Sequence, residues 1–164
     1  MDWVFNGLPV HSLLVHFTVI IIPAAALAMV LTAFWPAARR RLGLVTPLLA
    51  LAALAAVPLT VSAGEWLYER VEHTSAAQAH EASGRSILPW AIALLIVAIL
   101  QWAWYRFGAK WSTGKGNASP RSARLAVTAV LTLAVVVAAI GSVVTVVIIG
   151  EAGTAAVWVG NFTN

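Results

Sequence analysis

Long runs of apolar residues, separated by short polar stretches, dominate the chain. The runs cover about residues 9–35, 42–63, 87–107 and 125–149. A helix needs about 20 apolar residues to cross a hydrocarbon core of about 30 Å, whereas a barrel strand alternates in polarity over about 10 residues. The pattern therefore predicts an all-α, polytopic membrane protein, with the 164 residues forming one four-transmembrane-helix bundle.

The charges between the runs predict how the bundle is oriented. Eight of the ten Lys and Arg residues lie in or beside the loops 36–41 and 108–124. Basic loops close to span ends stay in the cytoplasm, so both termini and the loop 64–86 are expected on the outer side (N-out, C-out). The first run is longer than a signal-peptide core and is expected to be retained. We expect the protein in a bacterial cytoplasmic membrane.

Composition narrows the possible chemistry. The chain is 61% hydrophobic and 10% charged, whereas soluble domains carry about 25% charged residues. The absence of cysteine excludes disulfides, iron–sulfur clusters, thiolate metal sites and covalently attached haem. The net charge of +4 gathers at span ends, so the expected partner is the lipid bilayer and not nucleic acid.

All four histidines and all six acids fall on the predicted outer side. His11 and His16 lie near the start of the first span. Five residues rotate a helix by about 500°, which places the two rings about 140° apart, so they do not hold one ion from the same face. His16, between Val15 and Phe17, is expected to be the more buried. Ionisable groups inside a span are costly and usually functional.

The outer loop and the end of the fourth span add further polar residues. Glu65, Glu69 and His73 follow helical spacing, which predicts that the second span continues as a helix beyond the membrane. Glu81 and Arg85 form a predicted i, i+4 ion pair. Because side chains of facing helices meet in a bundle core, we expect one polar pocket at the outer end, made by His11, His16, His80, Glu65 and Glu151.

The opening "GLPVHSLLVHF" resembles a widespread bacterial family of four-span membrane proteins of unknown function. Its members begin with a Gly-Leu-Pro-x-His-x-Leu-Leu-Val-His-Phe-like motif. They also share a glycine-acidic step, matched by Gly64 and Glu65, and a histidine that opens the third span, matched by His80. The chain departs from the motif at Ser12 and Thr18, where prolines are common. Some relatives are fused to Rieske-type or cytochrome domains, which implies electron transfer for the histidines.

Three hypotheses follow for the histidines. In the first, His16 and His80 ligate haem b from opposite sides, His11 and Arg85 hold its propionates, and redox proteins or quinone are the partners. In the second, zinc, copper or iron is held by the three imidazoles of His11, His16 and His80 together with a carboxylate of Glu65 or Glu151.

In the third hypothesis the histidines have structural or proton-linked roles. The sequence contains no HExxH, GxSxG or GxGxxG motif and leaves open whether the protein is an enzyme.

Overall fold

A computed structural model of the protein describes residues 3–111 and 121–158. Within them, four helical segments are long and apolar enough to cross a membrane. These are Val10–Phe34, Val45–Tyr68, Ser75–Gly108 and Arg121–Trp158. The predicted all-α four-helix bundle is therefore confirmed.

The elements follow one another without a large insertion. Their order is β1 (Val4–Phe5), β2 (Leu8–Pro9), α1 (Val10–Phe34), α2 (Pro36–Leu42), α3 (Val45–Tyr68), α4 (Ser75–Gly84), α5 (Ile87–Trp111) and α6 (Arg121–Trp158). Residues 112–120 of the predicted loop 108–124 lie outside the described residues, and its two ends are helical.

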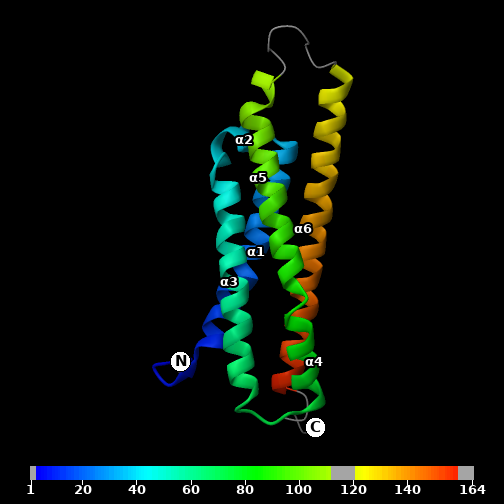
Figure 1. Cartoon of the computed structure of the whole chain (residues 1–164). Helices are drawn as coiled ribbons and strands as arrows, with labels where there is room; N and C mark the ends of the chain where they lie inside the picture. Colours follow the sequence, from blue (N-terminus) through cyan, green and yellow to red (C-terminus); the bar gives the residue numbers. More distant parts are fainter. Residues whose placement is uncertain (1–2, 112–120, 159–164) are drawn as a thin grey trace.

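The four long helices form a ring in which sequence neighbours run in opposite directions (Figure 1). α1 packs against α3 and α6, and α5 packs against the same two helices from the opposite corner. The short helix α4 packs against the last part of α6. Both ends of the described chain and α4 therefore lie at one end of the bundle, called here the histidine end, and α2 lies at the other, called here the arginine end (Figure 1).

Small residues fill the space between the helices. The fully buried core is mostly alanine, with a few larger side chains; its central members are Ile22, Ala25, Met29, Ala50, Ala53, Val57, Ala91, Leu94, Ala98, Val135 and Ala138. Large apolar side chains such as Ile20, Val130 and Leu133 are instead exposed on the outside. This inverted distribution is expected in lipid, where close backbone packing rather than burial of large side chains drives helix association.

Two polar contacts cross the apolar core. The hydroxyl groups of Thr18 and Thr60 lie 2.8 Å apart and join α1 to α3. Nearer the arginine end, Thr32 donates to the side-chain oxygen of Gln101 at 3.0 Å, and the amide of Gln101 donates to the carbonyl of Met29 at 3.1 Å. Gln101 thereby joins α5 to α1 across the ring.

The ends of the short elements follow local rules. Pro36 is the first residue of α2, where a missing N–H costs nothing, and Gly43 follows α2 with a positive φ of 32°. Asn6 and Gly7, both with positive φ, form the tight turn between β1 and β2. Thr74 caps α4 by accepting a hydrogen bond from the backbone N–H of Ala77 at 3.1 Å.

The outer loop contains more structure than the sequence predicts. The second span does continue beyond the predicted boundary at residue 63, and α3 ends at Tyr68. The prediction that this helix extends through His73 is wrong, because the chain turns after α3 before α4 begins at Ser75. Helix α4 was not predicted, since its sequence SAAQAHEASG contains no apolar run.

Candidate functional site: a histidine pair

His11 lies in the first turn of α1 and faces α3. Its Nδ1 lies 3.0 Å from the backbone carbonyl oxygen of Thr60. The ring rests directly on the α3 backbone, because a Cβ atom built on Gly64 would come within 2.9 Å of its Cε1. The absence of a side chain at Gly64 therefore leaves the space that the imidazole occupies.

His80 has the same surroundings on the other side of the bundle. It belongs to α4, and its Nδ1 lies 3.2 Å from the backbone carbonyl oxygen of Ile149 in α6. A Cβ atom built on Gly153 would come within 3.0 Å of the Cε1 atom of His80. Each imidazole is thus seated on a glycine of a neighbouring helix and fixed by a carbonyl of that helix.

The two rings meet at the histidine end. The centroids of His11 and His80 are 6.2 Å apart, and the ring planes cross at 71°. A carbonyl oxygen only accepts hydrogen bonds, so Nδ1 of each ring carries the proton and donates it. In the neutral form of each ring the lone pair is then on Nε2, and neither Nε2 has a hydrogen-bond partner among the described residues. The neutral pair can therefore offer two nitrogen atoms as ligands or bases.

His16 lies away from this pair. Its Nδ1 donates to the carbonyl of Ser12 in its own helix, and its side chain is exposed while His11 is half-buried. The predicted separation of the two rings onto different faces of the helix is confirmed. The expectation that His16 is the more buried of the two is wrong, because the face of α1 that carries His16 contacts no other helix there.

The acidic residues of the expected pocket make other contacts. Nη2 of Arg85 lies 3.0 Å from a carboxylate oxygen of Glu65 and 2.8 Å from one of Glu81. The predicted pair of Glu81 and Arg85 is confirmed, and it is extended to α3 through Glu65. Glu151 is exposed and forms no ion pair with any described residue.

The expected five-residue pocket is thus reduced to its two central imidazoles, His11 and His80. Among residues 3–111 and 121–158, no three His, Asp or Glu side chains are grouped so that they could hold a metal ion. Of the five residues expected in the pocket, the described structure brings together the imidazoles of His11 and His80.

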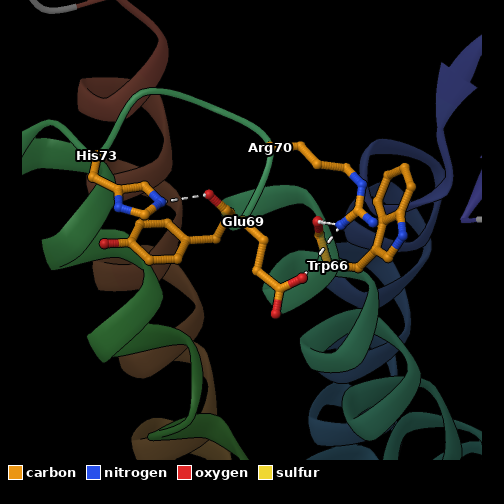
Figure 2. Close-up of polar contacts among 5 residues, drawn as sticks. Trp66, Glu69, Arg70 and His73 are labelled. Atoms are coloured by element: carbon orange, nitrogen blue, oxygen red, sulfur yellow. Dashed lines mark hydrogen bonds and ion pairs between the residues drawn. The ribbon is translucent and has the colours of Figure 1, made fainter.

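His73 has a structural environment in the turn after α3, shown in Figure 2. Its ring stacks on that of Tyr68, with centroids 4.3 Å apart, and its Nε2 donates to the Tyr68 carbonyl at 3.0 Å. Arg70 covers the ring of Trp66 at 4.1 Å, donates to the Trp66 carbonyl at 2.7 Å and pairs with Glu69 at 3.3 Å (Figure 2). These contacts satisfy carbonyls at the end of α3, which have no partner within the helix.

One sequence signal identifies the inward face of α1. Buried residues recur at Thr18, Ile22, Ala25 and Met29, with alternating steps of four and three residues. Extending this stripe back by seven residues reaches His11 and not His16. The roles of the Thr60 and Ile149 carbonyls have no comparable signal, because backbone groups are present at every position.

Searches with the chain against protein-family models, curated proteins and solved structures found no match.

Proposed function

We propose that His11 and His80 are the two protein ligands of a b-type haem, and that the protein takes part in electron transfer at the histidine end. The observation that carries this proposal is the pair of Nδ1 contacts, to Thr60 and Ile149, which leave both Nε2 atoms free. Metal-binding histidines characteristically donate their second ring nitrogen to a carbonyl or carboxylate, which fixes the tautomer and the ring orientation.

The distance between the rings supports the same proposal. A metal–nitrogen bond is about 2 Å, and a coordinating nitrogen lies about 1.1 Å from its ring centre, so two imidazoles on opposite sides of one metal have centroids about 6 Å apart. The observed separation of His11 and His80 is 6.2 Å. The distance between the two ring centres therefore matches the distance expected for two ligands of one metal.

Haem is favoured over a bare ion by the number of ligands. Structural zinc takes four ligands, and catalytic zinc takes three from the protein, but the described residues bring together only two imidazoles here. The porphyrin of haem supplies four nitrogen ligands, so the protein has to supply only the axial ligands. Two histidines are then a complete set.

Arg85 has no part in this proposal, because it already lies between Glu65 and Glu81. The role first expected for His16 as an axial ligand passes to His11, which is the residue that faces His80. The partner would be a redox protein or a quinone that approaches the histidine end, since the pair lies at one end of the bundle and does not connect its two faces.

Absorption spectra of the purified protein test the proposal. In detergent, the oxidised protein should show a Soret band, and dithionite should sharpen the α and β bands. His11→Ala and His80→Ala should each remove these bands. His16→Ala is the matched control: it deletes an imidazole from the same helix, and the spectrum should not change.

A colourless protein after reconstitution with haem would overturn the haem proposal. Elemental analysis of the same samples would then show whether the pair holds zinc, copper or iron in place of haem.

A structural role is the second candidate, because the contacts of the pair connect α1, α3, α4 and α6. It predicts a colourless, metal-free protein whose melting temperature falls in His11→Ala and His80→Ala but not in His16→Ala.

A further inference from the structure

A second polar site lies at the arginine end of the bundle, far from the histidine pair. It is a half-open pocket of about 290 Å³ between α2, α3 and α5. Three arginines surround it: Arg39 and Arg40 of α2, and Arg106 of α5. Its volume is close to the lower limit of small-ligand sites, which is roughly 300 Å³.

The floor of this pocket contains a buried hydroxyl group without a partner. Thr46 is 2% exposed, and its Oγ1 makes no hydrogen bond. Its polar neighbours on the floor, Thr32 and Gln101, satisfy each other and the Met29 carbonyl. This hydroxyl has almost no solvent-accessible area, so Thr46 lines the pocket with its other atoms, and the arginines at the rim are the groups that a ligand can reach.

The start of α3 contributes positive potential to the same place. Thr46 is the second residue of α3, which is 24 residues long and has no side chain capping its N-terminus. The first backbone N–H groups of a helix lack partners within the helix and carry partial positive charge, which favours an anion. Gly43, which follows α2 and lies two residues before the start of α3, also lines the pocket.

The arginines differ in how far they are already engaged. Arg39 donates to the carbonyls of Thr32 and Ala33 at 2.9 and 2.8 Å, and it lies 3.5 Å above the ring of Tyr105. Arg40 and Arg106 are exposed, and neither forms an ion pair with a described residue. Two guanidinium groups are therefore available to an anion at the rim.

No acidic side chain competes for these arginines. The described acids are Glu65, Glu69, Glu72, Glu81 and Glu151. All five belong to the end of α3, the turn after it, α4 or the last part of α6, which form the histidine end (Figure 1). The pocket thus combines net positive charge with an aromatic wall formed by Trp102 and Tyr105.

We infer that this pocket binds a phosphate group, with Arg40 and Arg106 contacting its oxygens. Guanidinium groups match phosphate geometry with paired N–H donors. The phosphate belongs either to the headgroup of an anionic lipid or to a soluble phosphate compound. This site is independent of the haem proposal and lies at the opposite end of the molecule.

Two probes distinguish the sources. The full-length protein is placed in nanodiscs of phosphatidylcholine with phosphatidylglycerol, and native mass spectrometry counts the phosphatidylglycerol that stays bound after release. In parallel, inorganic phosphate is titrated against protein in phosphatidylcholine nanodiscs, and the melting temperature is recorded. Retained phosphatidylglycerol identifies a lipid headgroup, and a rise in melting temperature with phosphate alone identifies a soluble ligand.

Matched variants show whether the pocket is responsible. The double variant Arg40→Gln/Arg106→Gln should weaken binding of the active probe about tenfold or more, because each lost contact is a charge-assisted hydrogen bond. Thr46→Val, which keeps the shape of the side chain, should leave binding unchanged, because the hydroxyl oxygen that it removes has almost no accessible surface. Arg41→Gln removes the same charge from an exposed position on α2 outside the pocket and should leave binding unchanged.

The inference is overturned if neither probe binds the wild-type protein. Equal weakening by Arg41→Gln and by the double variant would also overturn it, since binding would then depend on net charge alone. Thr46→Val is a second control, because it changes a buried side chain beside the pocket without changing the charge.

Discussion

At the scale of single residues, three glycines let rings lie directly against a helix backbone. Gly64 and Gly153 seat the imidazoles of His11 and His80. Gly141 has the closest such contact: a Cβ atom built there would come within 2.1 Å of the ring of Trp90. These positions hold the helices together through shape, and a single methyl group is enough to change the fit.

Replacing Gly141 by alanine should destabilise the bundle by about 1–3 kcal/mol, the usual cost of an overpacked core. The ring of Trp90 is large and rigid, so either the ring or α6 has to move. The measurement is the melting temperature in detergent, followed by intrinsic tryptophan fluorescence.

Gly150→Ala is the control on the same helix, because a Cβ atom there meets nothing within 4 Å. Alanine is favoured over glycine in a helix by about 0.5–1 kcal/mol, so this variant should be unchanged or more stable. Equal effects of the two substitutions would show that the contact with Trp90 is unimportant.

At the scale of elements, Arg39 connects three helices. From α2 it satisfies two carbonyls at the end of α1, those of Thr32 and Ala33, and it covers the ring of Tyr105 in α5. The last carbonyls of a helix have no partner within the helix. A guanidinium group satisfies two of them at once because its donors form a planar fork.

Arg39→Lys should therefore destabilise the protein by about 1–3 kcal/mol although it keeps the charge, since lysine cannot donate to both carbonyls from a fork. The chemical denaturation midpoint in detergent measures the effect. Arg41→Lys, at an exposed position of the same helix, should be neutral. A neutral Arg39→Lys would mean that charge alone holds α2 in place.

The elements differ in how well the sequence predicts them. The four spans are predictable because the transfer of an apolar run into lipid depends on the composition of that run, and the composition can be read directly from the sequence. Helix α4 is different: it is polar, has a capping threonine at Thr74, and packs on α6. Its partner on α6 is about seventy residues away in sequence, so no local pattern shows that His80 meets Gly153.

The sequence predicted at which end of the bundle the candidate site lies and that histidines form it. The identity of the facing pair was not, because the rotation of α1 about its axis decides between His11 and His16. That rotation is set by packing against α3 and α6. The stripe of buried residues that runs through Thr18 and Ile22 leads back to His11. A simple hydropathy profile does not show this stripe, because the lipid-facing side of α1 also carries large apolar residues.

At the scale of the whole molecule, charge is divided between the two ends. The arginines of α2 and of the first turn of α6 lie at one end, and the described acids and histidines lie at the other. Basic loops remain in the cytoplasm, so we expect the arginine end inside and the histidine end outside. The sequence contains no cysteine, so a single introduced cysteine is the only thiol that a maleimide can label.

Single-cysteine variants test this orientation. Ala79→Cys lies on the exposed face of α4, and Ser122→Cys lies on the exposed first turn of α6. In intact bacterial spheroplasts a membrane-impermeant maleimide should label Ala79→Cys at once and label Ser122→Cys only after permeabilisation. The reverse pattern would place the arginine end outside and contradict the positive-inside assignment.

The alanine-packed middle of the bundle also acts as an electrical insulator. Its central buried side chains are apolar, so we expect most of the transmembrane voltage to fall across this region. A charge that crosses the full voltage changes in energy by about 2.3 kcal/mol per 100 mV. The histidine pair and the arginine pocket lie at opposite ends of the bundle, so we expect each to respond mainly to the solution at its own face.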